Sequence, residues 1–442
     1  SEMCIRDSTN ITHALYISEN SVMGEYVRYP YKMDSLKLFF SMTKTFSGLA
    51  TGIAWDLGLL HMDDPIIGFF PEECPGTPDE NLSRITVQHL LTMSCGIHEN
   101  TYSDLFVQDN WVEAFLKQSF PHEPGTFYRY STHCSHMLSA IITKVSGLSL
   151  EHFLNRYLFY PMEIYEAQWE LSPEKLTAGG MGLSLYPMSL VKIAQLLLKE
   201  GSYNGSQLIS KEYLKMAVTQ QIIKQGDINN PDSEFSGNGY GYQFHIGKDG
   251  YYRMDGAFGQ LCLLCPDKKK AVIVFSQYSK TEALLSLIYK HLLNDTECCC
   301  AYIENTRPEK NAAAVDAVIP CSNFRLEDNI LGIKYVEFLP SCNEYLVKLC
   351  YAEYTDSIRF SLLQETSGKM NFLKDLQVHK QEYYCEAVFN EVLILKIYFI
   401  ETPYVAVYRF SFYGNKLRFE FSINVSFTLK DFAVDGFLVE ER

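Results

Sequence analysis

The segment that decides the fold is LFFSMTKTFSGLATGIAWDLGLL, Leu38 to Leu60, in which a serine stands three residues before a lysine. Apolar residues then recur with helical spacing at positions 46, 49, 50, 53 and 57, and Gly58 ends the run. We predict an amphipathic helix whose first turn brings Ser41 and Lys44 onto one face. A structural interpretation stays open here, because serine is a common N-cap residue and the lysine one turn later would then be solvated.

The spacing of these two residues suits nucleophilic catalysis. A serine hydroxyl becomes an effective nucleophile only when a base removes its proton, and a lysine can be that base if burial or nearby positive charge lowers its pKa. Phenylalanines at positions 39, 40 and 46 would supply an apolar setting, and the Ser41 backbone N–H could donate to a developing oxyanion. The same spacing recurs at Ser172 and Lys175 without an apolar helix, so we interpret that copy as a capped turn.

Composition and charge limit the class of protein. The 442 residues are 47% hydrophobic and 21% charged, which predicts two or three domains with ordinary globular cores. The net charge of −15 argues against nucleic acid and anionic membranes as partners. No apolar run reaches the about 18 residues of a membrane-spanning helix. We expect a soluble, cytoplasmic protein with a small-molecule substrate, and the sequence gives no indication of its oligomeric state.

The 13 cysteines follow no regular spacing, which argues against a disulfide framework and indicates a reducing compartment. Cys262 and Cys265 form a CxxC in an apolar, strand-like run without a second ligand pair, and we interpret them as buried thiols. We predict neither a metal site nor an organic cofactor. Residues 1–8, SEMCIRDS, resemble a translated sequencing adapter and are excluded from the fold prediction, so a lost signal peptide stays an open alternative.

The chain is predicted to contain two domains. Residues 9–294 read as strands, then helices, then strands, which indicates an α+β fold with an antiparallel sheet flanked by helices and a helical subdomain. Residues 295–320 have no periodicity and are predicted to form a linker. Residues 321–442 are rich in strand-like runs and are predicted to form a small all-β, barrel-like domain. We interpret that domain as packing beside the first, with an apolar ligand or a border of the active-site cleft as the alternative.

Further segments resemble the serine β-lactamase-like hydrolases, the family of class C β-lactamases, D-alanyl-D-alanine carboxypeptidases and related esterases. Besides the Ser41 helix, they are ITVQHLLTMSCGI (85–97), EPGTFYRYSTHCSHMLSAIITKVSG (123–147), TAGGMGLSLYPMSLVKIAQLLLKEGSYNG (177–205) and YGYQFHIGKDGYYRMDGAFGQ (240–260). They follow in the family's order through most of residues 20–294. The resemblance implies the β-lactamase/transpeptidase fold for this region and an acyl-enzyme mechanism. It also supports a β-barrel appendage.

Carried over residue by residue, the resemblance makes Ser41 the acylated nucleophile, Lys44 its base partner and Tyr130 the phenol that moves a proton to or from the leaving group. The alternative for Tyr130 is one more core aromatic residue. Thr132 stands where the family usually has asparagine, and so keeps a hydroxyl but lacks the amide that binds a substrate carbonyl.

The family's third motif, Lys-Thr-Gly or His-x-Gly, is also altered. Arg253-Met254-Asp255-Gly256 occupies that strand, and the Ala257 N–H is the expected second oxyanion donor. Asp255 is either a substrate-orienting acid or a turn residue, and Gly256 completes the predicted substrate-binding set with Thr132 and Ala257.

These residues predict a serine hydrolase of small esters or amides. A β-lactamase or carboxypeptidase is the alternative within the enzyme class, although the missing Lys-Thr-Gly normally engages a substrate carboxylate. A catalytically silent binding protein on the same fold is the alternative outside it. The sequence contains no G-x-S-x-G nucleophile elbow, and we interpret His89 as a structural residue.

Overall fold

The computed structural model describes residues 10–74, 76–100, 102–224, 234–293, 302–303, 319–341 and 344–439. Its chain divides into two compact units. The first contains the chain up to Val27 and from Leu36 to Glu304, and the second contains Arg28–Ser35 together with the chain from Asn305 onward. The segments predicted as non-native sequence (1–8) and as a linker (295–320) lie almost wholly outside the described residues.

The first unit is built on a nine-stranded sheet, antiparallel except where β14 pairs in parallel with β2. Its strand order is β14 (Tyr302–Ile303), β2 (Val22–Val27), β1 (Ile11–Ser18), β13 (Lys270–Ser276), β12 (Gln260–Cys265), β11 (Tyr252–Gly256), β10 (His245–Ile246), β9 (Gly239–Tyr240) and β8 (Ile222–Ile223). Smaller sheets are β3 (Lys37–Leu38), β5 (Leu183–Leu185) and β4 (Gln168–Trp169), and the hairpin of β6 (Ser202–Tyr203) and β7 (Ser206–Gln207).

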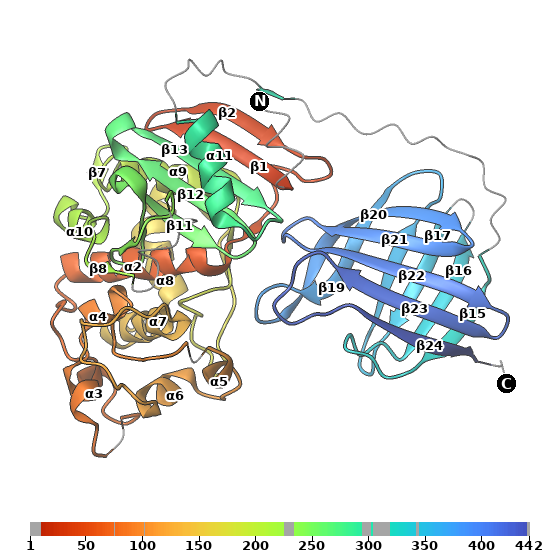
Figure 1. The fold of residues 1–442 in the computed structure, drawn as a ribbon, viewed down its shortest axis with the longest axis horizontal. Coiled ribbons are helices and arrows are strands. Elements are labelled where there is room, and N and C mark those ends of the chain that lie inside the picture. Colours follow the sequence, from red (N-terminus) through yellow and green to blue (C-terminus); the bar gives the residue numbers. More distant parts are fainter. Residues whose placement is uncertain are drawn as a thin grey trace. The chain divides into compact units, whose positions relative to one another are not determined.

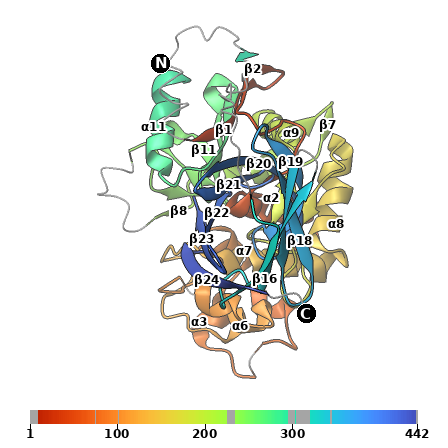
Figure 2. The same ribbon diagram turned by 90° about the vertical axis from the view of Figure 1, so that its right-hand side faces the viewer.

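Helices cover this sheet and form a separate helical region (Figures 1 and 2). The α-helices are α2 (Thr43–Asp56), α3 (Glu80–Arg84), α4 (Val87–Leu91), α5 (Tyr102–Phe106), α6 (Trp111–Lys117), α7 (Thr132–Ser146), α8 (Leu150–Leu154), α9 (Pro187–Leu198), α10 (Lys211–Ala217) and α11 (Thr281–His291). Shorter helical turns are η1 (Phe40–Met42), η2 (Ile66–Phe69), η3 (Asn155–Phe159), η4 (Tyr160–Met162), η6 (Lys248–Gly250) and η7 (Pro266–Lys268). Both views show α2 between the sheet and α7. Helices α3 and α6 lie beyond α7, at the end of the unit opposite α11.

The central position of α2 follows from its sequence. Its residues from Thr43 to Ala54 are all buried, so the helix is covered all round instead of showing the one apolar face that we predicted. Small residues permit this close packing: a Cβ on Gly48 would lie 3.0 Å from the Gln243 Cβ, and one on Gly52 would lie 2.3 Å from the Tyr213 ring. The helix also begins two residues later than predicted, because Ser41 lies in the preceding turn η1.

For the other elements, the sequence pattern predicts whether a segment is a helix or a strand better than it predicts where the element ends. The apolar periodicity of SHMLSAIITKVSG (135–147) predicts a helix that ends at its glycine, and Gly147 does end α7, in the left-handed conformation at φ 72°. The sequence pattern over 85–96 also predicts a helix, but the helix is shorter, because α4 ends at Leu91 and Met93 takes a φ of 56°. Residues 238–276 alternate with period two and predict three strands, whereas the structure has five there, β9 to β13.

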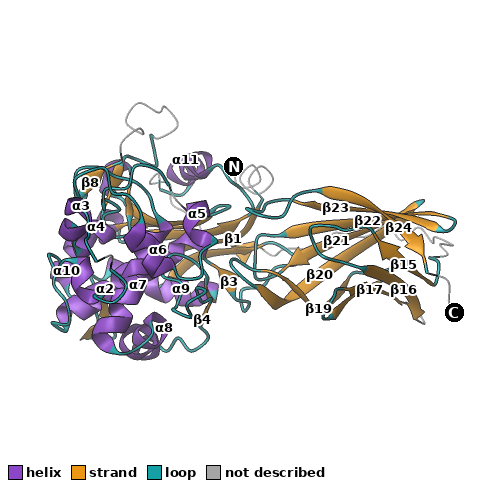
Figure 3. Ribbon diagram, turned by 90° about the horizontal axis from the view of Figure 1, so that it is seen from below, coloured by secondary structure: helices purple, strands orange, loops and turns teal. Residues whose placement is uncertain are grey.

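The second unit is a ten-stranded antiparallel, barrel-like sheet, which confirms the predicted fold (Figure 3). In spatial order the strands are β18 (Thr355–Phe360), β17 (Glu344–Cys350), β16 (Tyr335–Ser341), β15 (Ser322–Leu326), β24 (Phe432–Leu438), β23 (Lys416–Ile423), β22 (Val405–Tyr413), β21 (Val392–Phe399), β20 (Val378–Asn390) and β19 (Thr366–Leu373). The edge strands β18 and β19 also contact each other, so the sheet is nearly closed.

Aromatic rings fill the inside of this sheet. Phe410 packs edge-on against Phe338 and stacked on Phe419, each at a centroid distance of 5.1 Å, and all three are buried. The short segment Arg28–Ser35 belongs to this unit, where Lys32 Nζ pairs with Glu382 Oε1 at 2.6 Å. None of the described helices in either unit is long and apolar enough to cross a membrane.

Candidate active site

Ser41 and Lys44 are in direct contact. Lys44 Nζ donates to Ser41 Oγ at 2.9 Å and to the Gly180 carbonyl oxygen at 2.7 Å. The lysine side chain is buried, with 2% exposure for the residue, whereas Ser41 is partly exposed. The arrangement orients the amine toward the hydroxyl from inside the protein, which is the geometry that a base partner requires.

The backbone around Ser41 is held in a rare conformation. Phe40 has a φ of 47°, a region that bulky side chains seldom occupy. The Phe39 N–H donates to the Leu183 carbonyl at 2.9 Å, and the Phe40 ring packs edge-on against Phe258 at 5.4 Å. Phe258 also has a positive φ, 61°. These contacts fix the turn that carries Ser41 between the small sheet and the β11–β12 turn.

Tyr130 lies beside this pair. Its ring centroid is 5.0 Å from Lys44 Nζ, and a side-chain hydrogen bond joins its hydroxyl to Ser41. Burial raises the pKa of Tyr130 well above its usual value, and the charge of Asp255 raises it further, while the bond with Ser41 acts in the opposite direction. Tyr130 is therefore a neutral phenol in the free protein at neutral pH.

Thr132 is the first residue of α7 and packs against Gly180, the residue whose carbonyl Lys44 contacts. A Cβ on Gly180 would lie 2.5 Å from Thr132 Cγ2 and 2.7 Å from the Thr132 carbonyl oxygen, so only glycine permits this approach. The same Gly180 carbonyl accepts the bond from Lys44. The AGGMG segment thus joins the helix of Lys44 to the helix of Thr132, a role that its sequence alone did not reveal.

Strand β11 forms the opposite side of the site. Gly256 lies so close to the Ser41 turn that an added Cβ would be 2.3 Å from the Phe39 carbonyl oxygen. Asp255 precedes it, and both of its carboxylate oxygens accept from Arg253 Nε at 3.0 Å. Asp255 is thus a strand residue in an ion pair rather than a turn residue. Ala257 follows the strand, and its carbonyl accepts from Gln260 Nε2 at 3.1 Å.

Sequence reasoning missed His245. It lies on β10 opposite Arg253, with its ring 5.9 Å from that of Tyr130 and its Nε2 4.0 Å from Asp255 Oδ2. Burial lowers its pKa well below the usual value, and the charges of Arg253, Lys224 and Lys44 act in the same direction. Its Nδ1 is buried and has no hydrogen-bond partner among the described residues. The HIGKDG segment carries no motif that would have signalled this residue.

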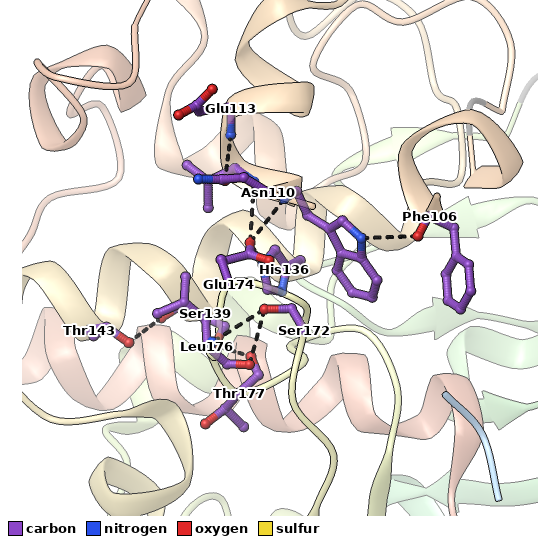
Figure 4. A network of polar contacts seen from close by, with 12 residues as sticks. Phe106, Asn110, Glu113, His136, Ser139, Thr143, Ser172, Glu174, Leu176 and Thr177 are labelled. Atoms are coloured by element: carbon purple, nitrogen blue, oxygen red, sulfur yellow. Dashed lines mark hydrogen bonds and ion pairs between the residues drawn. The ribbon is translucent and has the colours of Figure 1, made fainter. Parts of the chain in front are cut away.

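A second buried polar network lies behind α7 (Figure 4). Glu174 Oε1 accepts from the Trp111 backbone N–H at 3.1 Å and lies 3.0 Å from His136 Nε2. Burial acts to raise the pKa of Glu174, but the hydrogen bond and charge of His136, together with hydrogen bonds from the backbone and Ser172, lower the pKa overall. This network is structural support for the α7 region, because Glu174 contacts His136 of that helix and the backbone of α6.

The second SxxK pattern is the turn that we predicted. Ser172 Oγ donates to the Leu176 carbonyl at 3.2 Å, and Lys175 has a left-handed φ of 67°. His89 is also structural, because its Nδ1 accepts from the Thr86 backbone N–H at 3.1 Å in a capping box. Cys262 and Cys265 are buried, and no group of three or more potential ligands is placed to hold a metal ion within the described part of the chain.

The fold and the contact between Ser41 and Lys44 are those of the class that contains β-lactamases and penicillin-binding proteins. The model of the Beta-lactamase family matches residues 14–293. A β-lactamase from Yersinia enterocolitica is 25% identical over 125 residues, 28% of this chain and 31% of that protein, so the chain spans about a third of this relative. The chain belongs to the Beta-lactamase family, within the serine hydrolase superfamily of β-lactamases and penicillin-binding proteins.

Solved structures show the same fold. An octameric penicillin-binding protein homologue from Pyrococcus abyssi matches 98% of this chain and 98% of its own, with a TM-score of 0.53 and 17% identity. A penicillin-binding protein from Bacillus halodurans matches 66% of this chain and 98% of its own, with a TM-score of 0.53 and 16% identity. The first match extends over both units, and the second covers about two thirds of the chain.

Proposed function

We propose that this chain is a serine hydrolase that cleaves small esters or amides through an acyl-enzyme on Ser41. The observation that carries the proposal is the 2.9 Å contact between Lys44 Nζ and Ser41 Oγ in a site that Tyr130 shares. Burial disfavours the charged form of a lysine, so the low exposure of Lys44 supports a role in which its amine takes the serine proton during the reaction.

In the acylation step, Ser41 Oγ attacks the carbonyl carbon and its proton passes to Lys44. The backbone N–H groups of Ser41 and Ala257 are the proposed donors to the oxyanion. Collapse of the tetrahedral intermediate breaks the bond to the alcohol or amine, and Tyr130 protonates that leaving group. The raised pKa of Tyr130 supports this role, since a neutral phenol has a proton to give.

In the deacylation step, water attacks the acyl carbon and gives one proton to the Tyr130 phenolate. The protonated Lys44 then returns its proton to Ser41 Oγ as the bond between the acyl carbon and Ser41 breaks. The sum is an ester or amide plus water giving a carboxylic acid plus an alcohol or amine. Neither a metal ion nor an organic cofactor takes part in this scheme.

The charges beside Ser41 support uncharged substrates. The third motif's lysine is absent, and the Asp255 carboxylate lies on that strand instead. Its pairing with Arg253 balances its charge and leaves no cation in excess on that pair. A substrate carboxylate, which β-lactams and peptidoglycan peptides carry, would therefore find less attraction at this pair than at a lysine in the same motif.

The test compares hydrolysis of nitrophenyl acetate by the wild type, Ser41→Ala and Ser172→Ala. Both serines have a lysine three residues later, so Ser172 is a matched control for the motif. We expect Ser41→Ala to lose hydrolysis by at least about 100-fold and Ser172→Ala to keep it. Equal hydrolysis by the wild type and Ser41→Ala would contradict catalysis by Ser41 and would favour a binding protein with this fold.

A fluorescent penicillin separates the two enzyme classes. We expect weak or no labelling of Ser41 at concentrations that give full labelling with a fluorophosphonate. Rapid labelling with penicillin, followed by slow release, would instead assign the site to the penicillin-recognising branch.

A further inference from the structure

Two buried thiols face each other next to the segment that carries Tyr130. Cys95 lies in the loop after α4, Cys134 lies in the first turn of α7, and their sulfur atoms are 3.4 Å apart. Both side chains are fully buried, and both are free thiols. A disulfide needs a sulfur–sulfur distance of about 2.0 Å, so only a small side-chain movement separates the pair from a covalent bond.

The two segments are already joined by backbone contacts. The Arg129 N–H donates to the Met93 carbonyl at 2.9 Å, and the Ser131 N–H donates to Met93 Sδ at 3.4 Å. The thiol contact therefore extends an existing attachment of the Tyr130 segment to the loop after α4. This attachment also holds the two chain segments side by side, so the two sulfur atoms stay close to each other.

We propose that Cys95 and Cys134 form a specific disulfide cross-link when the protein meets a disulfide oxidant. The thiolate of one cysteine attacks a sulfur of the oxidant and displaces one thiolate. The thiolate of the second cysteine then attacks the mixed disulfide and displaces the other. Two protein thiols and one low-molecular-weight disulfide become one protein disulfide and two small thiols, so electrons and protons balance.

Burial sets the route by which the cross-link forms. The hydrogen bond with Cys95 and burial raise the pKa of the Cys134 thiol, which slows its reaction in the closed protein. The oxidant therefore reacts during folding or during local opening of the loop. Once the loop packs against α7 again, the short distance between Cys95 and Cys134 makes each the partner of the other. The link leaves the other cysteines independent, and so differs from the disulfide framework that the irregular spacing excludes.

The test uses the full chain, denatured and refolded in oxidised glutathione or in dithiothreitol. Free thiols are then blocked by alkylation and the protein is digested without reduction. We expect a linked peptide pair of Cys95 and Cys134 in mass spectrometry, and a melting temperature that is higher by about 5 to 10 °C than in the reduced protein. Dithiothreitol should remove both signals, and Cys134→Ala or Cys95→Ala should show neither.

Cys321 and Cys262 provide controls. Cys321 is exposed, so its glutathione adduct shows that the oxidant acted, and Cys262→Ala should keep the linked peptide. Alkylated, unlinked Cys95 and Cys134 beside glutathionylated Cys321 would overturn the proposal. This mapping on the wild-type chain needs no variant to fold, and its outcome is independent of hydrolysis, so it fails or succeeds separately from the proposed function.

Discussion

At the scale of single residues, Lys44 is the side chain on which the proposed chemistry depends. Its Nζ contacts Ser41 Oγ and the Gly180 carbonyl, and its charge acts on the neighbouring histidines His133 and His245. A lysine in this position can give up its proton, whereas an arginine keeps its own at every relevant pH. This difference separates a base from a fixed positive charge.

We therefore expect Lys44→Arg and Lys44→Met both to lower kcat/KM for nitrophenyl acetate by about 100-fold or more. Circular dichroism should show that each variant is folded. If Lys44→Arg hydrolysed the ester at the wild-type rate, Lys44 would supply only charge and the base would have to be another group.

His133 links the site region to stability. Burial, with the charges of His136 and Lys44, lowers the pKa of His133 to about 3, against about 6.5 in the unfolded chain. Between these values the unfolded chain binds the additional proton, so this residue makes stability fall as the pH is lowered from 6.5 toward 3. The loss is on the order of 1 kcal/mol at pH 5.5.

The expected result is a melting temperature that drops between pH 7.5 and pH 5.5, with a drop that is about 2 to 4 °C smaller in His133→Gln. His61→Gln, a change at an exposed histidine, should retain the wild-type drop. Identical drops in the wild type and His133→Gln would show that His133 does not supply this pH dependence.

Several residues of the candidate site could be named from the sequence because they belong to recognisable blocks. Ser41, Lys44 and Tyr130 stand in segments with a fixed order, and the structure brings them together. His245 could not be named, because its contact with Tyr130 depends on the pairing of two short strands rather than on any local pattern. The ion pair of Asp255 with Arg253 likewise depends on side chains on one strand face, two residues apart.

At the scale of elements, the close approach of β11 to the turn of Ser41 determines the width of the site. Gly256 permits it, because the Phe39 carbonyl oxygen occupies the space that a side chain would need. The same strand carries the proposed oxyanion donor just beyond its end. A shift of the strand by a few tenths of an ångström or more would thus change the geometry of the oxyanion without touching Ser41 or Lys44.

Gly256→Ala should lower kcat/KM for nitrophenyl acetate by at least about 10-fold, because the added methyl group would lie 2.3 Å from the Phe39 oxygen. Gly68→Ala is the matched control, since a Cβ at Gly68 meets no atom within 4 Å. Loss of activity in both variants, or in neither, would contradict this account of the strand.

The elements themselves were predictable to different degrees. Strand-like runs predicted β16 to β18 and β21 to β23 of the second unit, but not β15, β19, β20 or β24. In β19 and β20, polar and charged residues hide the alternation of buried positions. The turn η1 was missed because a left-handed φ at Phe40 has no signal in a bulky residue.

At the scale of the whole molecule, the chain contains two units, and every residue of the proposed site belongs to the first. The β-rich composition of the C-terminal part predicted the second unit correctly. The assignment of Arg28–Ser35 to that unit could not be predicted, because its contacts, such as Lys32 with Glu382, join residues 350 positions apart.

A chain that ends at Glu304 should therefore keep Ser41-dependent hydrolysis of nitrophenyl acetate within about 3-fold of the full chain, since no proposed step uses a residue of the second unit. Ser41→Ala in the same shortened chain is the control. A folded shortened chain without activity would show that the second unit takes part in the reaction.

The central claim is that Ser41 becomes acylated, and one measurement tests it directly. The protein is mixed with nitrophenyl acetate, quenched in acid within the first turnover, and digested for mass spectrometry. We predict an added acetyl group on the peptide that contains Ser41, in the wild type and in Ser172→Ala, and none at this position in Ser41→Ala. Ester hydrolysis by the wild type with the acetyl group on another residue, or with equal turnover by Ser41→Ala, would contradict the account.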